Sequence, residues 1–259
     1  MPKTDLPLRV HAVPFFTSGS AIQLVTTLEV DLEAFPPARS DGQIDDIFEF
    51  GLFAADLKKK KVTHSAGRRV EVAWPLENGA PSGAPSFKVQ SVMTLPPGPY
   101  QLRASATGKG IDKTGSVYLL VDVPSADDPL VVSGLAVTSR EAEAHDPKLV
   151  YAKPLSGLTL PFTPTLTRVF QSTDELRVFF QVRRKNTGMQ VNGGASLVDE
   201  AGAAHAAVSW TLTSPRDSSV DVRLPLADVA TGPYNLRVMA SDGVHHAWRN
   251  VGVRVEHNR

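Results

Sequence analysis

The chain contains no cysteine among its 259 residues. This absence excludes disulfide bonds, thiolate catalysis, and zinc or iron–sulfur sites that cysteine would ligate. A net charge is lacking as well, because Lys and Arg together number 27 and so do Asp and Glu. A neutral chain has no overall field that would draw it to nucleic acid or to anionic lipid. We therefore expect no nucleic-acid partner.

Long apolar runs are also missing from the sequence. No stretch approaches the length of a transmembrane helix, and Met1–Asp5 leads into no apolar signal core. We expect no direct insertion into a membrane, and the residues alone leave the localisation open. Helical periodicity of useful length is absent too, whereas 20 prolines and 19 glycines separate short alternating apolar segments. This composition predicts an all-β protein.

One stretch, Leu95–Arg103, returns in part 134 residues later. Its Gly-Pro-Tyr core recurs at Gly232–Tyr234, and in both places the tyrosine opens an alternating segment. At the same offset, Val117, Leu119 and Val121 match Val251, Val253 and Val255. A recurring turn followed by a strand in register indicates that the chain consists of two similar halves.

The Gly-Pro pair predicts a chain reversal, because proline fixes φ and glycine tolerates conformations that other residues avoid. A tyrosine that opens a strand just after such a reversal is typical of the tyrosine corner of immunoglobulin-like sandwiches, where the phenol bonds to upstream backbone. We therefore predict two tandem immunoglobulin/fibronectin-III-like β-sandwiches with Tyr100 and Tyr234 at corresponding corners. The predicted domains are residues 1–124 and 130–259, and residues 125–129 form a short linker.

Residues 138–165 interrupt the repeat with an irregular insertion, which carries the densest group of possible metal ligands. Glu141, Glu143, His145 and Asp146 would offer hard oxygen ligands to calcium, but an exposed acidic loop is the better interpretation. Asp41, Asp45 and Asp46 form a second acidic group without the spacing of an EF-hand. We assign no metal site to the chain.

Two basic segments invite a functional interpretation that the sequence does not favour. Lys58–Lys61 lacks interleaved aromatic residues, so a solvated hairpin tip is expected rather than a nucleic-acid patch. Gly108–Gly115 is similar to a phosphate-binding loop, but Asp112 stands where glycine is needed and hairpin strands replace the strand-to-helix context. No cofactor-binding residue is predicted.

Two sequence motifs of well-known catalytic sites are missing from the sequence. No Gly-x-Ser-x-Gly elbow occurs, and no histidine pair has the helical spacing of a zinc protease. The seven histidines are scattered at positions 11, 64, 145, 205, 245, 246 and 257. We therefore predict no catalytic residue and no enzymatic activity.

The three tryptophans differ in what they predict. Trp74 and Trp210 each end an alternating valine strand, which favours packing inside a sandwich. Trp248 begins the last predicted strand beside His246 and is the better candidate for stacking on a sugar ring. An accessory module that binds carbohydrate or peptide through end loops or edge strands is therefore the alternative function.

An ordered series of segments resembles the region that follows the von Willebrand factor A domain in VWFA-related proteins of Acidobacteria. The residues that carry the resemblance are Leu6–Val10, Leu95–Arg103, Gly115–Tyr118, Val123-Pro124, Val132–Ser139, Pro164–Phe170 and Gly232–Tyr234. The resemblance implies an exported protein, periplasmic, secreted or at the cell surface, in which the sandwiches act as a stalk. It also implies a protein partner, which could be an upstream A domain.

The chain departs from that family because it contains neither an A domain nor an Asp-x-Ser-x-Ser motif. No metal-site residue can therefore be carried over from the resemblance, and the sequence does not predict whether the chain is a fragment of a larger protein. The leading prediction is a non-catalytic structural or adhesive module of two sandwiches. Its partner, its oligomeric state and the angle between its domains are not predicted.

Overall fold

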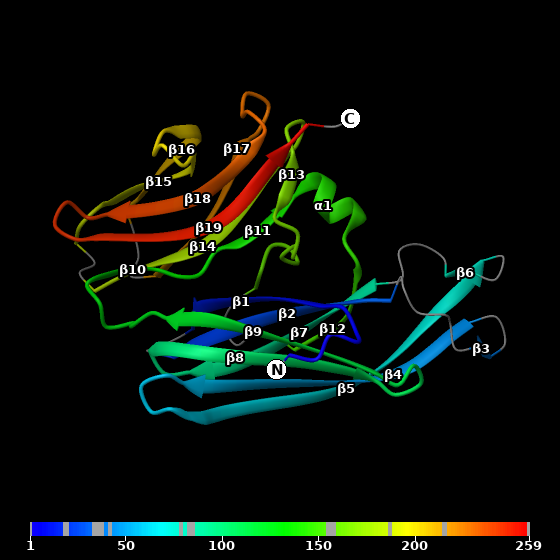
Figure 1. Ribbon diagram of the computed structural model, residues 1–259. Coiled ribbons are helices and arrows are strands. Elements are labelled where there is room, and N and C mark those ends of the chain that lie inside the picture. Colours follow the sequence, from blue (N-terminus) through cyan, green and yellow to red (C-terminus); the bar gives the residue numbers. More distant parts are fainter. Residues whose placement is uncertain are drawn as a thin grey trace. The chain divides into compact units, whose positions relative to one another are not determined.

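The computed structural model confirms that the protein is all-β, with nineteen strand segments and one short helix among the described residues (Figure 1). The structure describes residues 2–17, 21–32, 39–40, 43–77, 80–81, 86–153, 159–185, 188–213 and 217–257. Contacts between Cα atoms divide the chain into two compact units. Unit 1 comprises Met1–Ala12, Gln23–Val123 and Pro147–Leu155, and unit 2 comprises Val13–Ile22, Pro124–Asp146 and Ser156–Arg259.

Unit 1 consists of two sheets. One has the order β1-β2-β7-β12, and the other has the order β6-β5-β4-β8-β9 with β3 paired to β4. The strands are β1 (Leu8–Phe16), β2 (Ile22–Asp31), β3 (Arg39–Ser40), β4 (Gln43–Asp56), β5 (Lys61–Glu77), β6 (Ala80–Pro81), β7 (Ser86–Leu95), β8 (Gly98–Gly108), β9 (Lys113–Val123) and β12 (Lys148–Ala152). Aromatic rings join the sheets, because Phe87 of β7 packs edge-on against Phe48 of β4 with ring centroids 4.9 Å apart.

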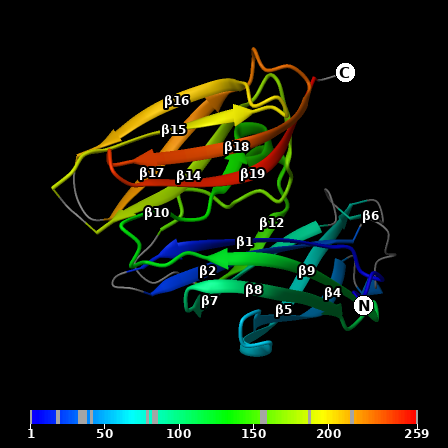
Figure 2. The same ribbon diagram turned by 60° about the vertical axis from the view of Figure 1, so that its left-hand side comes forward.

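Unit 2 also consists of two sheets. One contains β10-β14-β11 with β17 paired to β14, and the other has the order β13-β19-β18-β15-β16 (Figure 2). The elements are β10 (Leu130–Val132), β11 (Ala136–Ser139), α1 (Arg140–His145), β13 (Val169–Gln171), β14 (Glu175–Arg184), β15 (Val191–Val198), β16 (Ala204–Leu212), β17 (Asp217–Pro225), β18 (Gly232–Ser241) and β19 (His246–Glu256). One buried cluster that includes Val178, Leu197, Leu236 and Val255 joins the two sheets.

The two units share one strand order. In immunoglobulin-like sandwiches, strands A, B and E pair in this order in one sheet, and strands G, F and C pair in this order in the other. Unit 1 follows this order with β1-β2-β7 facing β9-β8-β4-β5, and unit 2 follows it with β11-β14-β17 facing β19-β18-β15-β16. The fourth strand of each second sheet, β5 or β16, occupies position C′. The sequence repeat therefore corresponds to a repeated topology.

Period-two burial explains why these segments form half-buried strands. In β18 the side chains of Tyr234, Leu236, Val238 and Ala240 are buried, while Asn235 and Met239 between them are exposed. Alternation of this kind places every second side chain in the core and leaves the other face of the sheet to solvent.

The contact units differ from the predicted domains in two short segments. Residues 147–155 belong to unit 1, where β12 pairs in parallel with β7. Residues 13–22 belong to unit 2, so the end of β1 and the first residue of β2 are assigned to unit 2, while the rest of these strands belongs to unit 1. The insertion at 138–165 is thus partly regular, since it supplies α1 and β12. The predicted linker at 125–129 follows the change of unit between Val123 and Pro124, and its role as a linker stays a prediction.

Candidate functional site

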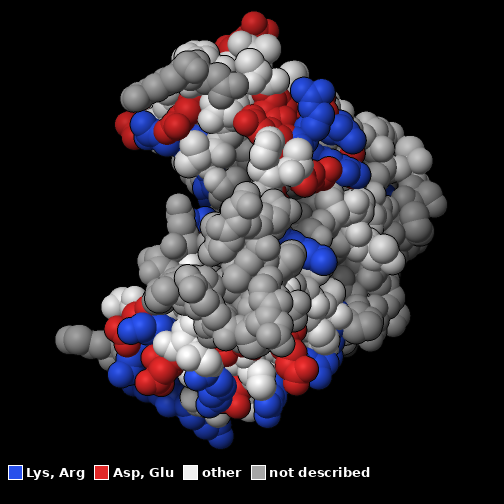
Figure 3. Space-filling view, turned by 90° about the vertical axis from the view of Figure 1, so that its right-hand side faces the viewer, with Lys and Arg blue, Asp and Glu red and all other residues white. Residues whose placement is uncertain are grey.

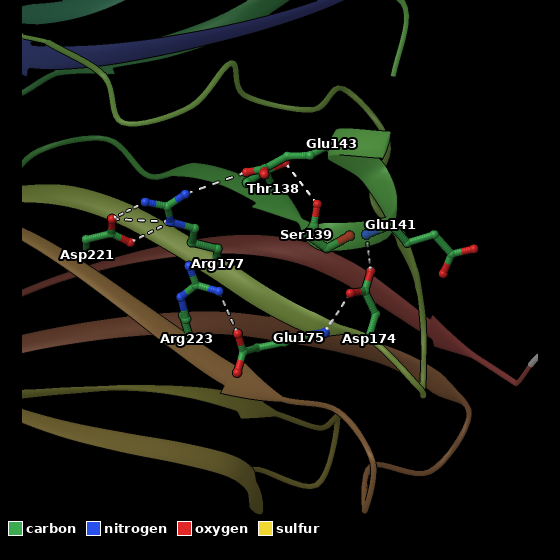
Figure 4. Close-up of polar contacts among 9 residues, drawn as sticks. All are labelled: Thr138, Ser139, Glu141, Glu143, Asp174, Glu175, Arg177, Asp221 and Arg223. Atoms are coloured by element: carbon green, nitrogen blue, oxygen red, sulfur yellow. Dashed lines mark hydrogen bonds and ion pairs between the residues drawn. The ribbon is translucent and has the colours of Figure 1, made fainter. Parts of the chain in front are cut away.

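The acidic insertion forms a polar cluster at one end of unit 2 (Figure 4). Ser139 begins the helix α1, because its Oγ accepts a hydrogen bond of 3.1 Å from the amide of Ala142. Asp174, from the turn before β14, accepts a bond of 3.3 Å from the amide of Glu141. Unpaired amides at a helix start are commonly satisfied by such oxygens. Two side chains therefore hold the first turn of α1 in place.

Arg177 of β14 is the centre of this cluster. Its guanidinium donates three hydrogen bonds of 2.6–3.2 Å to the carboxylate of Asp221 on β17. It also lies 3.7 Å from the carboxylate of Glu143 and over the ring of Phe162, 4.9 Å from the centroid. The hydrogen bonds to Asp221 raise the pKa of Arg177. The Arg177 side chain, on β14, thus contacts β17 through Asp221, α1 through Glu143 and the later part of the insertion through Phe162.

The four candidate calcium ligands do not converge on one point. Glu143 faces Arg177, and Asp146 accepts a hydrogen bond of 2.9 Å from the hydroxyl of Thr165. The ring of His145 lies 2.9 Å from the carbonyl oxygen of Glu141 one turn earlier, while the Glu141 carboxylate points away from the cluster in Figure 4. Among the described residues, no group of three acidic or histidine side chains could hold a metal ion.

Asp46 binds the loop at Gly108–Gly115, which is similar in sequence to a phosphate-binding loop. Its carboxylate accepts hydrogen bonds from the amides of Gly110 at 2.5 Å and Ile111 at 3.2 Å, and it lines a pocket of about 630 Å³. Backbone amides that point at one place are what a phosphate requires. Here an internal carboxylate occupies them. Asp41 and the side chain of Asp45 lie outside the described residues.

Lys58–Lys60 form an exposed turn between β4 and β5, and Lys61 begins β5. Asp56 accepts hydrogen bonds from the amides of Lys58 and Lys59, and these bonds lower its pKa. On the face drawn in Figure 3, Lys and Arg side chains lie among Asp and Glu side chains rather than in a field of one sign.

The two predicted tyrosine corners differ in their hydroxyl groups. Tyr234 donates a hydrogen bond of 2.9 Å to the carbonyl oxygen of Ala230, which is the predicted bond to upstream backbone. Tyr100 is also buried, but its hydroxyl makes no corresponding hydrogen bond to a described residue. Burial and the charge of Asp56 raise the pKa of Tyr100. The predicted bond is thus confirmed in unit 2 and not found in the described part of unit 1.

Trp210 and Trp248 occupy opposite environments in unit 2. Trp210 packs against Phe180, with ring centroids 5.7 Å apart, as the strand pattern predicted. Trp248 is 61% exposed on β19 and pairs with Met239 of β18, which is 49% exposed. Gly194 and Ser209 follow in the same row on β15 and β16, so small residues flank the exposed ring. The side chain of Trp74 lies outside the described residues.

Histidines in the described structure pair with different partners. His205 lies 2.8 Å from Asp199, His245 lies 3.1 Å from Asp242, and His257 lies 2.5 Å from the hydroxyl of Ser172. The sequence did not predict the Ser172–His257 contact, because 85 residues separate its members. A catalytic serine needs a base that is itself oriented by a third group. None of the described contacts supplies a carboxylate to this pair.

A pocket of about 390 Å³ beside the corner of unit 2 was also not predicted. Arg168, Glu200 and Arg254 contribute charged side chains to it. Arg168 donates to the carbonyl oxygens of Thr165 and Thr167, and burial lowers its pKa to about 10. Arg168 lies in the Pro164–Phe170 stretch that carried part of the resemblance, but no pattern there signalled a pocket.

No protein-family model matches the chain, and no curated protein matches it. Among solved structures it is similar to a glycosyl hydrolase family 2 member from Bacteroides cellulosilyticus, with 11% identity over 92% of this chain and 29% of that one, at a TM-score of 0.32. A putative beta-galactosidase from Bacteroides fragilis gives 9% identity, 92% and 33% coverage, and a TM-score of 0.31. Alpha-2-macroglobulin of E. coli gives 10% identity, 97% and 17% coverage, and a TM-score of 0.27.

The chain spans a third or less of each of these structures. At these scores the similarity carries no conclusion about activity, substrate or partner. The described residues form no helix that could span a lipid bilayer.

Proposed function

We propose that the chain is a non-catalytic structural or adhesive module, and that it forms the stalk or interaction region of an exported VWFA-related protein. The observation that carries the proposal is that the groups most suited to ligand chemistry are engaged within the fold. Asp46 occupies the amides of Gly110 and Ile111, and Arg177 engages Asp221 and Glu143. Such contacts stabilise loops and leave little for a substrate to bind.

The proposal includes the absence of enzymatic activity, and a panel of hydrolase substrates tests that part. We expect no turnover above the buffer rate with the purified chain. Metal-dependent turnover that is lost on substitution of a described residue would contradict it. The Ser172→Ala variant is the first to test if an esterase activity is found, because Ser172 is the described serine that contacts a histidine.

The proposed stalk role is tested by an immunoblot of fractionated native cells with antibody raised against this chain. We expect a band well above the 27.8 kDa of the chain, in envelope or secreted fractions. A band near 28 kDa confined to the cytoplasm would contradict both the export and the link to an A domain.

A second candidate function, the binding of carbohydrate, is favoured by Trp248. Its ring is exposed on a sheet face, and Arg237 and Asn250, in the neighbouring row, are joined by a hydrogen bond of 3.4 Å. An aromatic platform beside polar groups suits a sugar ring. A glycan array tests this candidate. Signals that Trp248→Ala removes and Met239→Ala retains would favour it over the structural module.

A further inference from the structure

β9 lies at the end of its sheet, and part of its outer edge is already paired. The N-terminal segment Lys3–Leu6 runs along it, since the amide of Ser116 donates to the carbonyl oxygen of Lys3 at 2.8 Å. The amide of Leu6 donates to the carbonyl oxygen of Thr114 at 3.2 Å, and Thr4 forms an antiparallel bridge with Gly115. The chain therefore shows that this edge accepts an added strand.

The pairing stops after Ser116, although β9 continues to Val123. Backbone groups of successive residues in a strand point alternately to the two sides. Because Thr114 and Ser116 bond outward, the amide and carbonyl groups of Tyr118 and Leu120 also point away from β8. Among the described residues, neither has a backbone hydrogen bond on that side. An open edge remains at Tyr118–Leu120.

The side chains next to this open edge are unusually apolar for a surface. Leu120 is 73% exposed and Tyr118 is 37% exposed. Arg103 and Gln101 of β8 come next in the same two rows, and the Arg103 guanidinium lies 5.5 Å from the centroid of the Tyr118 ring. Beyond β8, Phe53 of β4 is 43% exposed and Val62 of β5 is 60% exposed. Exposed apolar groups that gather on one face mark interaction sites. An added strand would cover Tyr118 and Leu120 first.

We propose that the open edge of β9 at Tyr118–Leu120 binds an extended segment of another polypeptide as an added strand. The partner segment carries apolar side chains at alternate positions, which pack on Tyr118 and Leu120, while its backbone bonds to theirs. Main-chain bonds supply affinity in this mode, and alternate side chains supply specificity. Unit 1 would then have a binding site and a partner class in addition to its role in the structural module.

The first test uses amide hydrogen exchange, read by nuclear magnetic resonance on the full chain. In the free protein we expect the amides of Tyr118 and Leu120 to exchange rapidly, and those of Leu119 and Val121, which face β8, to be protected. The probe is an acetylated nine-residue peptide of alternating valine and threonine with a lysine at each end. Its addition should protect Tyr118 and Leu120. Protection of both in the free chain would overturn the proposal.

The second test measures peptide binding by fluorescence anisotropy, with a control that removes only the backbone donors. The same peptide, N-methylated at alternate residues on its bonding edge, should bind at least tenfold more weakly. Equal binding of the two peptides, or no saturable binding of the first, would overturn the proposal, because side-chain adhesion alone does not require the backbone.

A matched set of variants locates the site on β9. Leu120→Pro removes an amide that faces away from β8, so it should weaken binding at least tenfold and leave the unfolding midpoint close to that of the parent chain. Leu120→Thr keeps the amide and should weaken binding less. Leu119→Pro removes a bond to β8 and should lower the midpoint. Unchanged binding by Leu120→Pro would overturn the proposal. It would also be overturned if the free chain is a dimer of two copies and Leu120→Pro dissociates that dimer.

Discussion

The two Gly-Pro-Tyr corners have the same sequence and similar burial, yet different interactions hold them. Gly98 of unit 1 has a φ of 144°, which side-chain-bearing residues rarely adopt, whereas Gly232 lies outside the left-handed region. In unit 2 the hydroxyl of Tyr234 bonds to the carbonyl oxygen of Ala230, and no matching bond joins Tyr100 to a described residue of unit 1. The motif therefore fixes where strand F begins in both units, but not which contact stabilises the corner.

The turns between strands F and G differ in the same way. In unit 2, Asp242 lies in the turn itself and accepts bonds from the amides of Val244 at 3.0 Å and His245 at 2.7 Å. In unit 1, the corresponding carboxylate comes from Asp46 on β4, which is 64 residues before Gly110. Each turn thus has an aspartate that binds its amides. One is local and the other is supplied by a neighbouring strand.

Truncation of matched core residues should have the largest effect. Leu102 and Leu236 are fully buried at equivalent positions of strand F. Each change to alanine should lower the free energy of unfolding of its own unit by about 2–5 kcal/mol, because it leaves a cavity. Urea titrations followed by circular dichroism measure this loss. If only one of the two variants is destabilised, Leu102 and Leu236 do not occupy equivalent core positions in the two units.

Substitution of the corner glycines should separate the two units. Gly98→Ala should destabilise unit 1 by about 1–3 kcal/mol, because alanine is strained at positive φ. Gly232→Ala should be nearly neutral, since an added Cβ would meet no atom closer than the Tyr234 ring at 3.8 Å. The comparison of urea midpoints tests this difference. Equal losses would show that the two corners have the same conformation.

Removal of the corner hydroxyls should give the opposite order. Tyr234→Phe leaves the carbonyl oxygen of Ala230 without its donor, so the loss should be about 1–2 kcal/mol. Tyr100→Phe should cost less than about 0.5 kcal/mol, because no such bond to a described residue is broken. Amide exchange of strand F in each variant provides the measurement. A larger loss for Tyr100→Phe would contradict the assignment of the hydrogen bond to unit 2.

Asp242→Asn should have a smaller effect, which depends on pH. Burial alone would raise the pKa of Asp242, but hydrogen bonds from His245 and Val244 lower it from 3.8 to about 2. A depressed carboxyl pKa stabilises the fold above about pH 4, and the contribution is lost as the pH falls through about 2. Thermal unfolding should show a lower midpoint for the variant at pH 7 and a smaller gap near pH 2. A constant gap would contradict the role of the charge.

The sequence predicted those features that local pattern determines. Alternation in segments such as Ile22–Asp31 and the offset between Tyr100 and Tyr234 were sufficient for strands, for the all-β class and for the repeat. The bond from Tyr234 to Ala230 spans four residues and was predictable from the corner motif. Each of these features depends on neighbours in the chain.

Long-range pairings could not be predicted from the same patterns. The parallel pairing of β12 with β7 joins the insertion to unit 1, and period-two alternation does not name a partner strand. The bonds from Gly110 to Asp46 and from Arg177 to Asp221 join residues 64 and 44 positions apart. The sequence therefore showed acidic and basic groups as candidate sites, whereas the fold brings them together as internal contacts.

We expect the polar cluster around Arg177 to stabilise unit 2 without a bound metal ion. The most direct test is thermal unfolding of the full chain in excess EDTA and in excess calcium, with Glu143→Gln as the matched variant. We expect the same midpoint in both solutions, and only a small loss of unfolding free energy, of about 0.5 kcal/mol or less, in the variant. A midpoint that calcium raises in the parent chain and not in Glu143→Gln would contradict it.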